Sequence, residues 1–318
     1  MKKSVWAVIM SASLSGNHIM NYNTWFYQCL CISLFFVCQG QPVAWGQSPQ
    51  NPSPMVEHVR EHSRLVRKDP PGQRVKLSQG QLFIPEKLKN EKQAGEIKLL
   101  ITFHCGNWIP EMATYQLKEP LPCLSLQLGS GSGRYAKPFT DDPKLLEKLL
   151  KEIAVHLKRP ISSLVLVGWS AGYGSIREII HISEYESKVS HILLIDGLHT
   201  GYIGGKPGPL DSKLETEPLE PFLQFARKAV AGDKRLMILH SEIFPGTFAS
   251  TTETADWLIG KLQLKRRAVL QWGPMKTQQL GETNSGKMQI RAYAGNSALD
   301  HVDLLHGLPE FLPELLAL

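Results

Sequence analysis

The chain has 318 residues, 42% of them hydrophobic and 20% charged, so it is long and apolar enough to bury the core of one large domain. Its 35 Lys and Arg residues against 29 Asp and Glu residues give a formal net charge of +6. The basic residues are scattered, and the densest cluster, at residues 265–267, is short. We therefore predict no nucleic-acid site.

The first fifty residues differ in composition from the rest. Residues 25–40 form an apolar run that is short for a transmembrane helix but suits the apolar region of an export signal. Small residues, Ala44 and Gly46, precede a candidate cleavage position near Gln47. The sequence thus predicts export.

We divide the chain into three parts on this basis. Residues 1–46 are expected to be a signal peptide or an N-terminal anchor, residues 47–70 a linker and N-terminal extension, and residues 71–318 the main domain. The expected location is periplasmic, extracellular or surface-associated. Any membrane contact is expected only through the signal or anchor.

From residue 71 on, extended and helical patterns follow one another. Apolar runs predict two strands within residues 74–86 and one each in residues 96–104, 123–129, 163–169, 191–196, 235–240 and 288–295. Helical spacing appears in residues 109–117, 143–158, 175–182, 218–230, 251–262 and 308–316. Residues 129–142 are glycine-rich and are expected to form a surface loop.

Strict alternation of strand and helix is typical of parallel pairing with right-handed crossovers. We therefore predict an α/β fold with a doubly wound, mostly parallel sheet of about eight strands and helices on both faces. Ligands of such sheets bind at the carboxyl ends of the strands. The residues that follow each strand are thus the candidates for function.

Two cysteines, Cys105 and Cys123, lie in the main domain, where the sequence allows either a disulfide or two free thiols. No C-x-x-C pair is present. We predict no metal site and no bound cofactor.

One strand end carries a recognisable motif. The apolar run that ends at Trp169 passes through Gly168-Trp169-Ser170-Ala171-Gly172 directly into a helical pattern. A buried strand that enters a helix through so tight a turn forces the central residue into a strained backbone conformation and exposes its side chain. Ser170 is therefore a candidate nucleophile.

The other strand ends supply the partners that a nucleophilic serine needs. In chain order they are the His104-Cys105-Gly106-Asn107-Trp108 stretch, Ser170, Asp196, Glu242 and His301. A serine hydroxyl needs an imidazole to take its proton and a carboxylate to hold that imidazole in the correct tautomer. Serine, acid and histidine occur here in that order.

These residues and their order resemble the α/β-hydrolase family from about residue 74 to the carboxyl terminus. The resemblance implies that Ser170 is the nucleophile and His301 the base. The "HCGNW" stretch is similar to the His-Gly-x-x-Trp form of the oxyanion loop, with Cys105 at the usual glycine position. We expect the backbone N–H groups of Gly106 and Ala171 to be the oxyanion donors.

The resemblance leaves two candidates for the acid. Asp196 ends an apolar strand and precedes a glycine, the pattern of a carboxylate presented at a sheet edge, and we favour it. Glu242, after the next strand, is the alternative.

The predicted function is that of an exported serine hydrolase that cleaves a small carboxylic ester through an acyl-enzyme. Aromatic and imidazole side chains near the serine are expected to line its substrate pocket, namely Trp108, Trp169, Tyr173 and His199. Two alternatives remain open, a peptidase or amidase on the same fold and a catalytically silent surface or binding protein.

Overall fold

A computed structural model describes residues 61–90, 95–205 and 212–318 of the chain, all within one compact unit, Pro52–Leu318. The predicted signal or anchor, residues 1–46, lies outside the described residues, as does most of the predicted linker. Its assignment, and that of the domain boundaries, remains a prediction. Over the described ranges, no helix is both long and apolar enough to cross a membrane.

Ten strands of the described chain form one sheet in the order β1-β2-β4-β3-β5-β6-β7-β10-β9-β8. They are β1 (Gly72–Lys76), β2 (Gln81–Pro85), β3 (Ile97–Phe103), β4 (Cys123–Leu126), β5 (Ile161–Trp169), β6 (Val189–Ile195), β7 (Arg235–His240), β8 (Arg267–Trp272), β9 (Gln278–Ser285) and β10 (Met288–Tyr293). The six strands from β4 to β10 in this order pair in parallel, and the outer strands on both sides pair antiparallel. The predicted fold class is confirmed.

The predicted strand number of about eight was too low, because β8 and β9 were missed. Strand β8 is exposed along nearly its whole length, and β9 has the polar sequence QQLGETNS. Neither segment therefore shows the continuous apolar run that marks a strand buried on both faces. Both are antiparallel strands at one edge of the sheet, and neither contributes a buried hydrophobic side chain to the core of the described chain.

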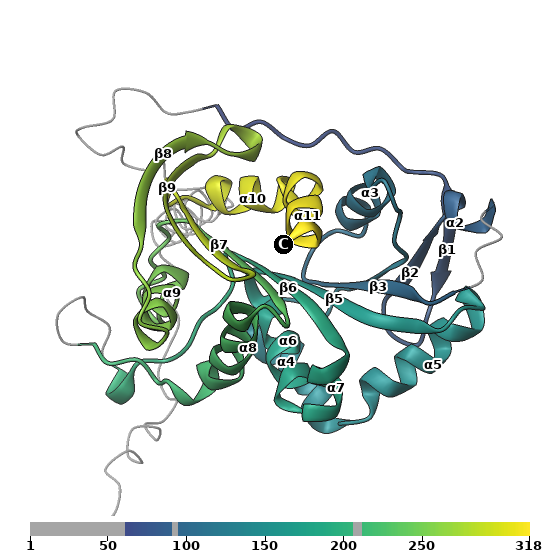
Figure 1. Cartoon of the computed structure of the whole chain (residues 1–318), viewed down its shortest axis with the longest axis horizontal. Coiled ribbons are helices and arrows are strands. Elements are labelled where there is room, and N and C mark those ends of the chain that lie inside the picture. The colour runs from purple at the N-terminus through teal and green to yellow at the C-terminus, as the bar shows by residue number, and fades with distance from the viewer. Residues whose placement is uncertain (1–60, 91–94, 206–211) are drawn as a thin grey trace, which may run out of the picture. The chain divides into compact units, whose positions relative to one another are not determined.

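Helices cover both faces of the sheet (Figure 1). They are α2 (Glu86–Asn90), α3 (Trp108–Gln116), α4 (Ser132–Asp141), α5 (Leu145–Leu157), α6 (Tyr173–His181), α7 (Ser183–Lys188), α8 (Glu220–Ala231), α9 (Thr251–Lys261), α10 (Ala298–His306) and α11 (Leu308–Ala317). Helices α4 to α9 contribute to one hydrophobic cluster, and α3, α10 and α11 to the other. Two apolar cores thus sandwich the sheet.

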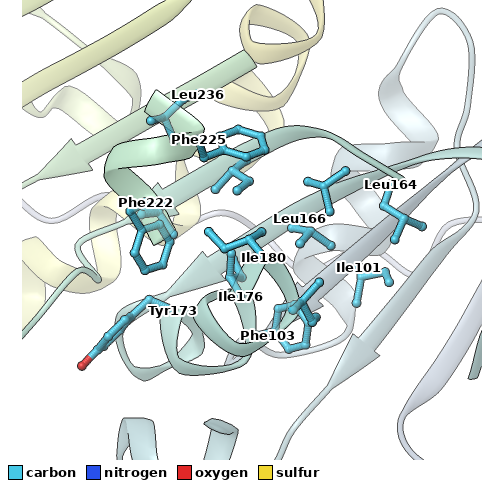
Figure 2. Close-up of a cluster of buried hydrophobic side chains, with 14 of the residues drawn as sticks. Ile101, Phe103, Leu164, Leu166, Tyr173, Ile176, Ile180, Phe222, Phe225 and Leu236 are labelled. Atoms are coloured by element: carbon cyan, nitrogen blue, oxygen red, sulfur yellow. The ribbon is translucent and has the colours of Figure 1, made fainter. Parts of the chain in front are cut away.

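The alternation of strand side chains explains the two cores. In β5, Leu164 and Leu166 belong to the first cluster, whereas Val165 and Val167 belong to the second. Figure 2 shows part of the first cluster, to which Leu164 and Leu166 belong together with Ile176 of α6 and Phe225 of α8. The apolar run of β5 is buried from both sides, as its sequence predicted.

The expected loop at residues 129–142 is wrong, because most of it is helix α4. Gly131 precedes the helix with a φ of 86°, and the glycines at its start hide the helical pattern in the sequence. The helix is held by Tyr135 and Phe139, which are 0% and 5% exposed and pack into the first cluster. Tertiary burial here outweighs poor helix propensity.

Cys105 and Cys123 are free thiols and both are buried. Burial raises the pKa of Cys105 to about 12 and also raises the pKa of Cys123. Both thiols thus remain protonated at neutral pH and act as small apolar side chains.

Candidate active site

Ser170 lies in a short 3-10 turn, Ser170–Gly172, between β5 and α6, and its φ is 48°. This left-handed backbone is unusual for a residue with a side chain. Gly172 permits the turn because a Cβ there would come within 2.5 Å of the Phe103 carbonyl oxygen. The end of β3, and with it the start of the 104–108 loop, therefore lies against the turn that carries Ser170.

Strand β6 brings Asp196 to the same place. A Cβ on Gly197 would come within 2.2 Å of the Ser170 carbonyl oxygen, so the chain after β6 touches the serine turn. Asp196 itself has a φ of 48°. Two neighbouring parallel strands thus end in left-handed residues that meet at the carboxyl edge of the sheet.

Asp196 holds the imidazole of His301. The Nδ1 atom of His301 lies 2.8 Å from Asp196 Oδ2 and donates to this carboxylate. Ser241 donates twice to the same group, through its backbone N–H to Oδ1 at 2.9 Å and through its hydroxyl to Oδ2 at 2.6 Å. Both oxygens of this carboxylate, which is only 4% exposed, thereby accept hydrogen bonds.

These contacts keep Asp196 ionised. Burial acts to raise its pKa, but the hydrogen bonds and charge of His301, with the bonds from Ser241, outweigh burial and lower the pKa below the ordinary value. A lowered carboxyl pKa adds stability at pH values above the unfolded-state pKa. This contribution is lost as the pH falls through the folded-state pKa.

His301 lies on α10, a helix that the sequence did not predict. Ser297 and Asp300 form a capping box at its start, since the Ser297 hydroxyl accepts from the Asp300 N–H and the Asp300 carboxylate accepts from the Ser297 N–H. Such a cap stabilises a helix by about 1 kcal/mol. Asp300 is thus a helix-entry residue, and only its neighbour His301 reaches the acid.

Residues 61–70 belong to no helix or strand. They form hydrogen bonds to α10. His62 Nδ1 lies 2.7 Å from Asp303 Oδ2, and the Leu65 N–H donates to His306 Nδ1 at 2.9 Å. Both acceptors belong to α10, so this segment helps to position the helix that carries His301 (Figure 1).

Ser170 and His301 line one pocket of about 310 Å³. Its remaining lining residues are Asp196, His199, Ile243, Pro245, Phe248, Thr251, Asn296 and Ala298. Within the described chain no hydrogen bond joins the Ser170 hydroxyl to His301. Such bonds are often long before a substrate binds, so the shared pocket is the relevant observation.

Three of the four predicted pocket residues lie outside this lining. Trp108 meets the His306 ring edge to face at 5.6 Å, and Tyr173 is 6% exposed within the first core cluster. Trp169 packs against His301. Only His199 lines the pocket itself.

Trp169 supports the imidazole of His301 in two ways. The rings stack with centroids 4.6 Å apart and an interplanar angle of 30°, and the indole N–H donates to the His301 carbonyl oxygen at 3.2 Å. The indole also stacks on His104, at 5.2 Å. His104 in turn bonds the Tyr135 hydroxyl at 2.8 Å, which anchors this set of rings to α4.

For the ester hydrolysis that the sequence predicts, we expect Trp169→Leu to lower kcat with a short-chain ester up to about tenfold with little change in KM, since a ring pair contributes about 0.5–1.5 kcal/mol. The physical reason is that His301 loses the surface that orients it. Trp272→Leu is the matched control, because Trp272 is 72% exposed on β8 and should leave both constants unchanged. Wild-type kcat in Trp169→Leu would contradict this positioning role, and Trp169→Phe should restore part of the loss.

Glu242, the alternative acid, is exposed and contacts Gly295 rather than His301. Its carboxylate accepts from the Gly295 N–H at 3.3 Å, and its own N–H donates to the Gly295 carbonyl at 2.8 Å. It makes no bond to His301. Of the predicted oxyanion donors, Ala171 belongs to the serine turn itself and Gly106 to the loop between β3 and α3, and their role remains a prediction.

Several residues of the site were missed from the sequence. Ser241 follows β7 and bonds the acid, and Ile243, Pro245 and Phe248 form an apolar wall in the same stretch. A signal existed, since these residues directly follow a strand end. The sequence pattern alone, however, did not distinguish these residues from a loop without function, because their neighbours in the site come from other strands.

The fold and the site together define a class of protein, one in which a strained serine and an aspartate–imidazole pair meet at the carboxyl edge of a mostly parallel sheet. Solved structures to which this chain is similar include a cold-adapted esterase from an Arctic intertidal metagenomic library, 14% identical over 74% of this chain and 87% of that one, with a TM-score of 0.42.

Others are an S-formylglutathione hydrolase from Agrobacterium tumefaciens (11% identity, 74% and 87% coverage, TM-score 0.41) and an acetyl xylan esterase from Aspergillus awamori (12%, 74% and 98%, TM-score 0.40). No known family model and no curated protein matches the sequence.

Proposed function

We propose that this protein is a serine hydrolase that cleaves carboxylic esters through an acyl-enzyme. The observation that carries the proposal is the Asp196–His301 pair in the same pocket as the strained Ser170. Because Nδ1 of His301 donates to the carboxylate, a neutral imidazole has its Nε2 lone pair available to take a proton.

The mechanism follows from these positions. His301 removes the proton of Ser170 as the hydroxyl oxygen attacks the ester carbonyl, and the ionised Asp196 stabilises the imidazolium. Backbone N–H groups of Ala171 and Gly106 are proposed to stabilise the oxyanion. The protonated imidazole then gives its proton to the departing alcohol. Water next attacks the acyl carbon as His301 takes its proton, and the imidazolium returns that proton to the Ser170 oxygen as the acid leaves.

The substrate is proposed to be a small acyl ester, since the pocket of about 310 Å³ is at the low end of ligand sites and has an apolar wall. Export remains part of the proposal and depends on the sequence of residues 1–46.

A fluorophosphonate probe tests the proposal directly. We expect covalent labelling of the full chain at Ser170, found by peptide mapping, together with hydrolysis of a short-chain ester. Faster turnover of the matched amide would favour a peptidase or amidase. A folded protein that takes no label and cleaves neither substrate would instead be a silent binding protein.

A further inference from the structure

The candidate pocket contains a second imidazole, that of His199, which the proposed mechanism does not use. It follows β6 closely and faces the same space as Ser170 and His301. Its surroundings differ from those of His301, because no carboxylate holds it.

Contacts of His199 define its tautomer. Its Nδ1 atom lies 2.8 Å from the Ala249 carbonyl oxygen, and since a carbonyl only accepts, Nδ1 must carry the hydrogen. Burial lowers the pKa of His199, which favours the neutral ring. A neutral ring with hydrogen on Nδ1 has a lone pair on Nε2.

Because His199 lines the pocket and its Nδ1 is bonded to Ala249, Nε2 is the ring nitrogen left for a ligand. The hydrogen bond of this ring to Ala249 is made through Nδ1, and Nε2 is not among the buried side-chain atoms that lack a partner in the described residues. The backbone of Asp196 also lies close enough to the ring to act on its pKa, in the raising direction. Two aromatic edges fix the ring, with centroids 5.7 Å away for Tyr173 and 5.0 Å away for Phe248. The acceptor is therefore pre-oriented.

The other residues of the pocket wall do not replace this acceptor, so the pocket favours ligands with a hydrogen-bond donor. Ile243, Pro245 and Phe248 offer no hydrogen bond, while Thr251 and Asn296 can each donate as well as accept. His199 Nε2 can only accept. A bound ligand without a donor would cover this nitrogen and leave it unpaired, which costs binding energy.

We infer that His199 is a specificity-determining residue that accepts a hydrogen bond from a substrate hydroxyl, so that the preferred substrates are hydroxy esters. The inference rests on the proposed ester hydrolysis. The hydroxyl belongs to the acyl part or to the alcohol part of the ester, and the two sources share the same chemistry at Nε2.

Four esters, one without a hydroxyl and three with one added hydroxyl, test this inference. Ethyl butyrate is the reference, 2-hydroxyethyl butyrate adds a hydroxyl to the alcohol, and the two enantiomers of ethyl 3-hydroxybutyrate add one to the acyl chain. We expect the full-length protein to show a kcat/KM about threefold to tenfold higher for one of the hydroxylated esters than for the reference. The favoured ester identifies the source.

Substitutions at His199 assign the preference. In His199→Asn the amide nitrogen replaces Nδ1 and still donates to the Ala249 carbonyl, but no acceptor replaces Nε2. The ratio of kcat/KM for the favoured hydroxy ester to that for ethyl butyrate should therefore fall to about 1. In His199→Gln the amide oxygen replaces Nε2, and part of the preference should return. His181→Asn, an exposed histidine at the end of α6, should match the wild type.

Equal kcat/KM for all the esters in the wild type, or a preference that survives in His199→Asn, would overturn the inference while leaving ester hydrolysis intact. An equal loss on every ester in His199→Asn would also overturn it, because that result indicates a role in catalysis or folding. If the protein takes no fluorophosphonate label and cleaves none of the esters, the proposed function fails and this inference with it.

Discussion

Replacing Ser170 by alanine is expected to lower kcat for ester hydrolysis by about 10⁴- to 10⁶-fold and to abolish fluorophosphonate labelling. The hydroxyl oxygen forms the covalent bond in the proposed mechanism, and no other hydroxyl shares its turn. The pocket and the Asp196–His301 pair stay in place, so binding of a non-reactive ester analogue should change little. Steady-state kinetics with a short-chain ester and intact-protein mass spectrometry measure both effects.

Two variants separate chemistry from folding in this test. Ser170→Gly should be as inactive as Ser170→Ala but no less stable, because glycine adopts a φ of 48° without steric cost. Ser187→Ala removes an exposed hydroxyl on α7 and should retain full activity. A Ser170→Ala variant with wild-type turnover would place the reaction at another nucleophile.

Asp196→Asn is expected to lower kcat by about 10³- to 10⁴-fold, whereas Glu242→Gln should stay within about twofold of the wild type. The amide accepts through only one oxygen and carries no charge, so it favours the wrong imidazole tautomer and cannot stabilise the imidazolium. Among the described residues Glu242 hydrogen-bonds to Gly295 alone, near the surface. Kinetics of the two variants with one short-chain ester compare the candidate acids directly.

If only Glu242→Gln lost turnover, Glu242 would be the catalytic acid. The contact of Asp196 with His301 would then play no part in the reaction. Thermal unfolding of the variants tests whether a loss of turnover comes from misfolding. Asp196 is 4% exposed and accepts from Ser241, so its amide variant must be shown to be folded before the kinetics are read.

Local sequence determined much of this protein. The apolar run of β5 is buried on both faces, and the glycines around Ser170 allow the tight turn that follows it. The close contact of Gly168 with Tyr173 lies within a few residues of the chain, whereas the room that Gly172 gives involves Phe103 of β3. The alternation of six parallel strands with helices was predicted from local patterns as well, whereas polar β8 and β9 were not.

The contacts of the site were decided by the tertiary structure. Asp196 and Glu242 both follow strands, and the packing of α10 over the ends of β5 and β6 is what brings His301 to the first of them. Trp169 looked like a pocket wall beside the serine, but its ring stacks on an imidazole 132 positions further along the chain.

The candidate nucleophile and the strand ends were therefore determined by the sequence alone, because backbone sterics and the burial of neighbouring side chains act over a few residues. Which acid meets the imidazole, which ring supports it and which nitrogen faces the substrate depend on distances between elements far apart in the chain. Those distances exist only once the sheet and its two layers of helices have packed.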